Sequence, residues 1–198
     1  MLICRKTING MKDFINHCTS FSPLELVAID DLGDSIASRF YKKGEHLLSE
    51  GETCKYLYFI NEGLVKVYSY KADKEFIMRF FAEDVIFSVY DSFINQTPSR
   101  YAIQAIEYTS ITRIGYKDLM DLCRKHHCIE TLFRIVTSQT AVRMTRRINE
   151  MLEENAHERY RIFLEENNAI IQRISLGDLA RYLGITQPSL SRIRSSKQ

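Results

Sequence analysis

Side chains that can form hydrogen bonds with bases cluster near the end of the chain, between Gln187 and Arg194. An arginine can present two parallel donors to the O6 and N7 atoms of guanine, and a glutamine can pair with adenine. We therefore expect Arg192 to read a guanine, and Gln187 to meet an adenine or a phosphate. Arg194 and the earlier Arg173 are expected to contact phosphates, which position a protein on DNA without reading its sequence.

Two short helical patterns flank Gly184 and would hold these side chains in place. Gly184 suits the left-handed backbone that ends a helix, Thr186 is a good N-cap, and Pro188 is tolerated in a first helical turn. The apolar positions are Leu176, Leu179, Ala180 and Leu183, then Ile185, Leu190 and Ile193. This pattern predicts a helix-turn-helix, whose second helix enters the major groove of DNA. An ordinary corner between two helices is the alternative.

The charge of this segment has the sign that a nucleic-acid partner requires. From Gln172 onward the chain carries five basic residues against one acidic residue, although the net charge of the whole chain is only +2. Basic side chains there would neutralise phosphates, whereas a basic tail without a function is the alternative. The predicted DNA contacts are Arg173, Thr186, Gln187, Ser189, Ser191, Arg192 and Arg194.

The composition is that of an ordinary globular protein, with 45% hydrophobic and 26% charged residues among 198. No apolar run is long enough for a membrane span and no signal peptide is recognisable, so we expect a cytoplasmic protein without a membrane partner. Five widely spaced cysteines favour reduced thiols. Cys123 and Cys128 flank two histidines, but no further cysteine pair completes a tetrahedral site, so we predict no metal.

Residues 9–38 have a helical pattern, and the pattern then changes to that of strands. Short runs rich in valine, isoleucine, tyrosine, phenylalanine and threonine follow one another, separated by turn residues. The predicted strands are 39–42, 45–48, 56–60, 64–70, 75–81, 101–105 and 109–114. Because no helices separate these strands, the sequence predicts an α+β protein with an antiparallel roll or sandwich rather than a parallel sheet.

A short helix is predicted at 117–123, and a long helix begins near residue 129. Alternating three- and four-residue steps along the long helix are typical of a two-stranded coiled coil. The predicted seam consists of Leu132, Ile135, Gln139, Val142, Arg146 and Asn149. We expect a homodimer; a helix packed only on its own roll is the alternative.

Asn155 and Glu158 have the spacing of a capping box, which predicts that a new helix begins there. The sequence therefore divides into helices plus β-roll at 1–115, a dimerisation region at 116–154, and a helix-turn-helix domain at 155–198.

The order of roll, long helix and helix-turn-helix resembles the cyclic-AMP receptor protein (Crp/Fnr) family of bacterial transcription regulators over essentially the whole chain. Gly44, Gly51 and Gly63 resemble the glycines at the turns of the family's roll, and residues 81–88 resemble the stretch entering its nucleotide pocket. Residues 186–194 are similar to its recognition helix, with Arg192 in place of the guanine-contacting arginine. The resemblance implies a homodimer on a two-fold symmetric site in double-stranded DNA, with RNA polymerase as a further candidate partner.

The nucleotide pocket departs from the family pattern. Members that bind cyclic AMP carry two glycines, a glutamate and an Arg-Ser or Arg-Thr pair, whereas this chain has Glu83, Phe87, Ser88 and Ser99-Arg100 at those places. A carboxylate, a bulky ring and a displaced arginine all oppose a bound phosphate. The predicted effector pocket consists of Phe87, Ser88, Val89, Ser99, Arg100 and Tyr101.

We therefore predict no cofactor and no binding of cyclic AMP. Another small-molecule effector, redox sensing through Cys54 or another thiol, and the lack of any effector are the alternatives. The chain stops four residues after Arg194, where the family continues into a β-hairpin wing, so we expect no wing.

No Ser/His/Asp or Cys/His arrangement and no Gly-rich phosphate loop is recognisable, so the sequence predicts no enzymatic activity. It predicts a sequence-specific DNA-binding transcription regulator. The alternative is a sensor or interaction module whose DNA-binding domain has decayed.

Overall fold

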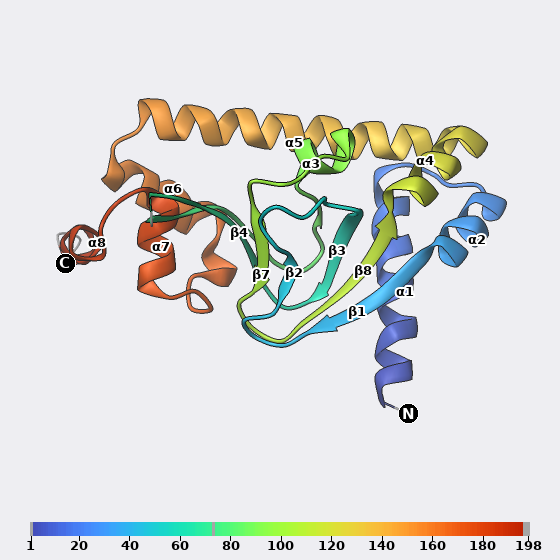
Figure 1. Ribbon diagram of the computed structural model, residues 1–198, viewed down its shortest axis with the longest axis horizontal. Helices are drawn as coiled ribbons and strands as arrows, with labels where there is room; N and C mark the ends of the chain where they lie inside the picture. Colours follow the sequence, from blue (N-terminus) through green and yellow to red (C-terminus); the bar gives the residue numbers. More distant parts are fainter. Residues whose placement is uncertain (1, 73, 196–198) are drawn as a thin grey trace.

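An antiparallel β-roll forms the middle of the molecule, and helices pack around it (Figure 1). The computed structural model describes residues 2–72 and 74–195, with side chains described from Gly10 onward. Helices α1 (Leu2–Phe21) and α2 (Leu26–Ser35) lie at one end of the roll, and the C-terminal helices lie at the other (Figure 1). Within the described residues, no helix is long and apolar enough to cross a membrane.

The roll consists of two four-stranded sheets in which every pairing is antiparallel. Their strand orders are β1-β8-β3-β6 and β2-β7-β4-β5. The strands are β1 (Ile36–Tyr41), β2 (His46–Leu48), β3 (Tyr56–Glu62), β4 (Val65–Lys71), β5 (Lys74–Phe81), β6 (Ile86–Phe87), β7 (Ala102–Ala105) and β8 (Thr109–Gly115). The predicted antiparallel roll is confirmed, and only the two-residue β6 was missed, because so short a strand shows no periodicity.

Gly63 makes the turn between β3 and β4 possible. Its φ is 107°, and a Cβ atom there would lie 2.6 Å from the carbonyl oxygen of Tyr108 and from Oγ1 of Thr109. Both the left-handed backbone and the close approach of a second chain segment require a glycine.

Helix α5 (His127–Glu153) runs along the roll and joins its two ends (Figure 1). The other helices are α3 (Tyr90–Asn95), α4 (Tyr116–Lys125), α6 (Ala156–Glu166), α7 (Leu176–Leu183) and α8 (Gln187–Ser195), with a 3₁₀ turn at Asn168–Ile170. The predicted cap of α6 is confirmed, since the Asn155 side chain accepts a hydrogen bond of 3.0 Å from the backbone N–H of Glu158. Helix α3 was not predicted.

Two apolar cores stabilise the molecule. The first fills the roll and includes buried side chains of α1, α2, α4 and the first half of α5. The second joins the opposite face of β4 and β5 to the C-terminal helices, and its aromatic centre is Phe80 against Phe163 and Tyr182, with ring centroids 6.4 and 5.6 Å apart. The C-terminal helices therefore share a core with the roll.

Candidate nucleic-acid interface and ligand cavity

Helices α7 and α8 form a helix-turn-helix. The turn follows from local interactions: Gly184 is left-handed with a φ of 69°, and the Ile185 N–H donates to the Ala180 carbonyl oxygen at 3.0 Å. Thr186 caps α8, because its Oγ1 accepts a hydrogen bond of 3.3 Å from the Ser189 N–H. Leu190 is only 1% exposed, so the inner face of α8 is fixed against α7.

The outer side of α8 carries the side chains predicted to contact DNA. Thr186, Gln187, Ser191, Arg192 and Arg194 are exposed, and only Ser189 is partly buried. Within the described residues, neither Arg192 nor Arg194 makes a salt bridge through its guanidinium group. The structure thus places six of the seven predicted contacts on one short exposed element.

Arg173 differs from the prediction. Its guanidinium group donates to both carboxylate oxygens of Glu83, at 2.9 and 2.7 Å, and to Glu107 at 2.5 Å. These hydrogen bonds raise the pKa of Arg173 above its usual value. Two roll carboxylates already neutralise this arginine, so it is not free to meet a phosphate in this conformation.

A second set of ion pairs fixes α7 on the roll. Lys66 of β4 is buried, and its Nζ lies 2.6 Å from Glu75 and 3.3 Å from Asp178 at the start of α7. Arg181 of α7 also pairs with Asp178, at 3.0 Å. Because both sets cross between roll and C-terminal helices, they reinforce the shared apolar core.

A cavity of about 290 Å³ lies between the roll and α5. Most of its wall is apolar, with Val67 and Phe81 from the strands and Met144 and Ile148 from α5. Four residues of the predicted effector pocket line it: Phe87, Ser88, Val89 and Tyr101.

Ser99 and Arg100 do not line this cavity, contrary to the prediction. The Ser99 hydroxyl donates to the Tyr101 carbonyl oxygen at 2.8 Å and accepts from the Tyr101 N–H at 2.9 Å, so it stabilises its own loop. Arg100 is exposed. Glu83 also lies outside the wall, since its carboxylate binds Arg173 and the N–H of Gly63.

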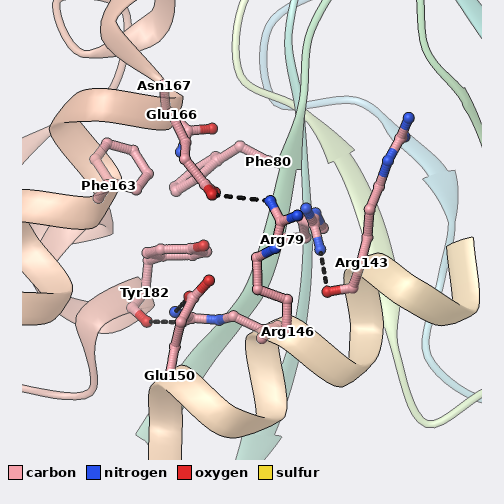
Figure 2. A pocket seen from close by; sticks show the side chains of 10 residues that line it. Arg79, Phe80, Arg143, Arg146, Glu150, Phe163, Glu166, Asn167 and Tyr182 are labelled. Atoms are coloured by element: carbon pink, nitrogen blue, oxygen red, sulfur yellow. Dashed lines mark hydrogen bonds and ion pairs between the residues drawn. The ribbon is translucent and has the colours of Figure 1, made fainter. Parts of the chain in front are cut away.

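Three arginines that the sequence analysis missed line the cavity: Arg79 of β5, and Arg143 and Arg147 of α5. Figure 2 shows Arg79 and Arg143 at the junction of β5, α5 and the C-terminal helices. Arg147 is held by that junction, because its guanidinium group lies 3.8 Å over the Tyr182 ring and donates to the Tyr182 carbonyl oxygen at 2.5 Å. The four-residue spacing of Arg143 and Arg147, one helical turn, was the available signal.

The residues of the predicted dimer seam lie in different environments, some buried against their own roll and some exposed. Leu132 is 7% exposed and belongs to the core of its own roll, so it does not face a partner. Ile135 is partly buried, and Gln139 and Asn149 are exposed. The remaining seam residues are Val142, which is 61% exposed, and Arg146, which pairs with Glu166 at 3.1 Å.

Cys54 is fully buried, and its Sγ lies 3.3 Å from the Ser88 hydroxyl behind the cavity wall. Reactive thiols sit in accessible, electropositive surroundings, so this position does not favour redox sensing. Within the described residues, no group of three or more potential metal ligands comes together.

The architecture is thus a roll with a cavity between it and α5, joined through this long helix to a helix-turn-helix. Residues 38–126 match the family of cyclic nucleotide-binding domains. This family model describes a ligand-binding module. None of the curated proteins matches the sequence significantly.

Solved structures extend the similarity to the whole fold. FixK2 from Bradyrhizobium japonicum is 22% identical with a TM-score of 0.69, over 81% of this chain and 83% of that one. The c-di-GMP-responsive regulator CLP of Xanthomonas campestris is 17% identical with a TM-score of 0.69, over 88% and 92%. A protein described as a Crp/Fnr-family regulator from Eubacterium rectale is 15% identical with a TM-score of 0.69, over 86% and 82%. Residues 38–126 therefore resemble a cyclic nucleotide-binding domain, and the chain as a whole shares the fold of these solved structures.

Proposed function

We propose that this chain is a sequence-specific DNA-binding transcription regulator whose roll responds to an effector other than cyclic AMP. The observation that supports it best is the capped helix α8, which presents Arg192 and Arg194 without intramolecular ion pairs among the described residues. An exposed arginine on a helix in the major groove can bind guanine through two hydrogen bonds.

The experiment is selection of binding sites from random duplexes, followed by anisotropy titrations with the selected site. We expect the Arg192→Ala variant to lose the preference for one G·C pair in each half-site, because the bidentate contact is removed. The Arg194→Ala variant should weaken binding to all DNA sequences equally and reduce the salt dependence of binding. An unchanged base preference in Arg192→Ala would refute the assignment of the reading residue.

The proposal includes a homodimer formed along the second half of α5. Val142 and Leu152 are 61% and 79% exposed, so this part of the helix presents apolar side chains that its own roll does not cover. A two-fold axis there would place two copies of α8 on half-sites about one helical turn of DNA apart. Sedimentation at micromolar concentration tests this, and a monomer would contradict it.

A sensor module that no longer reads DNA is the second candidate. It is favoured by the neutralisation of Arg173 by Glu83 and Glu107, which removes one cation from the DNA-facing domain. The salt dependence of binding to random duplex separates the two functions. A DNA reader loses affinity steeply as salt rises, whereas a decayed module gives negligible binding even at low salt.

A further inference from the structure

The cavity between the roll and α5 combines an apolar interior with excess positive charge on one side. Three arginines and a single aspartate, Asp91, line it. Arg147 is held by Glu150 and Tyr182. Among the described residues, the Arg79 side chain makes one hydrogen bond, of 3.4 Å to the Arg143 carbonyl oxygen. Across the described residues, no carboxylate lies within ion-pair distance of Arg79 or Arg143.

The apolar part of the cavity is preformed. Phe87 is buried and stacks on Phe81 at 4.6 Å and on Tyr58 at 5.4 Å, so two fixed rings shape the wall on the roll side. Met144 and Ile148 complete the opposite wall from α5, and both are exposed, at 43% and 56%. The volume of about 290 Å³ is just below the range that is usual for small-molecule sites, about 300–1,000 Å³, so a small ligand fits best.

These features define the chemistry of a fitting ligand. Apolar walls favour a hydrocarbon body. Arg79 and Arg143, which have no carboxylate partner among the described residues, lie where β5 meets α5 and favour a negative group that can accept hydrogen bonds from both elements. A ribose phosphate fits poorly, because few polar groups lie along the roll side and Ser99-Arg100 is outside the wall.

We propose that this cavity binds an amphipathic monocarboxylic acid, with its apolar body against Phe81 and Phe87 and its carboxylate on Arg79 and Arg143. This proposal rests on the proposed function, because it names the effector class of the same roll. Arg143 lies one helical turn before Arg147, whose guanidinium group contacts Tyr182 of α7. The bound carboxylate would therefore lie beside the junction that positions the helix-turn-helix.

The test is isothermal titration calorimetry on the full chain with 4-phenylbutyrate and with its uncharged analogue 4-phenylbutan-1-ol. We expect saturable binding of the acid, and binding of the alcohol weaker by roughly ten- to hundredfold, because charge-assisted hydrogen bonds are lost. Cyclic AMP should not compete. An acid that fails to bind, or that binds no more tightly than the alcohol, would overturn the proposal.

Three variants locate the site. The double variant Arg79→Gln and Arg143→Gln should weaken binding of the acid by roughly ten- to hundredfold and leave the alcohol unchanged. Met144→Trp should weaken the binding of both ligands, because the larger ring occupies the cavity from the exposed α5 side. Arg134→Gln, which changes an exposed arginine of α5 outside the wall, is the matched control and should bind the acid normally.

Circular dichroism on each variant shows whether it is folded. Wild-type affinity for the acid in the folded double variant, or for both ligands in folded Met144→Trp, would refute this placement. Binding of the same preparations to random duplex keeps the two proposals distinct. Acid binding without DNA binding contradicts the proposed function, and DNA binding without acid binding contradicts the ligand class.

Discussion

Glu83 is the residue whose change should best reveal how the C-terminal helices are held on the roll. Its carboxylate accepts two hydrogen bonds from Arg173 and one of 2.8 Å from the Gly63 N–H. Burial by itself would raise the pKa of Glu83, but the hydrogen bonds from Arg173 and from backbone N–H groups lower it to about 2. The Glu83→Gln change keeps the size and one acceptor oxygen, but it removes the charge and replaces the other acceptor oxygen with an NH2 donor.

The magnitude follows from that pKa. A decrease from 4.5 to about 2 corresponds to roughly 3 kcal/mol if all of it stabilises the folded state. The Glu83 side chain is 36% exposed, so solvent screening reduces the contribution, and we expect about 1–2 kcal/mol. Because the folded-state pKa is the lower one, this stability is fully present above pH 4.5 and is lost as the pH falls from 4.5 to about 2.

Urea unfolding of the wild type and Glu83→Gln between pH 7 and pH 3 measures the effect. At pH 7 the variant should be less stable by about 1–2 kcal/mol, and the difference should shrink toward pH 3 because Glu83 becomes protonated in the unfolded wild-type chain before it does in the folded one. Glu50→Gln, at an exposed glutamate, is the control and should change little. Equal stability at pH 7, or a difference that does not depend on pH, would refute the role assigned to this ion pair.

The remaining predictions concern single positions. Gly63→Ala should abolish stable folding, because its Cβ would lie 2.6 Å from backbone and side-chain atoms, and unchanged thermal unfolding would contradict this. Leu190→Ala should lower the free energy of unfolding by about 2–5 kcal/mol, since the Leu190 side chain of α8 is buried against α7. Asn155→Ala should lower the free energy of unfolding by about 0.5–2 kcal/mol through loss of the α6 cap, whereas Asn155→Ser should keep most of that stability. Val142→Glu should shift sedimentation toward the monomer without loss of helix content by circular dichroism; an unchanged mass would place the dimer contact elsewhere.

The features that the sequence predicted correctly depend on short-range signals. Gly184, Thr186 and Leu190 lie within seven residues of one another, and each acts on its immediate neighbours in the turn or helix. The strands were recognisable because residue type and turn punctuation repeat along the chain. Helix α3 was missed because its six residues are fewer than two helical turns.

The errors concern contacts between distant segments. Arg173 was assigned to phosphates because its carboxylate partners Glu83 and Glu107 lie 90 and 66 residues away in the sequence. Arg79 and Arg143 became visible as cavity residues only when β5 and α5 came together. Leu132 fits the coiled-coil spacing, but the same helix face also meets the roll, and no period distinguishes the two partners.

The core shared by the roll and the C-terminal helices has a practical consequence for anyone who divides this chain. A fragment ending near Asn155 would leave Leu64, Tyr68, Ile77 and Phe80 uncovered on one continuous face of the roll. Newly exposed apolar patches of this kind cause association and aggregation. Truncation near Asn155, which the sequence pattern suggests as a domain boundary, would therefore expose this apolar face. A fragment of the roll would need polar substitutions on that face to stay in solution.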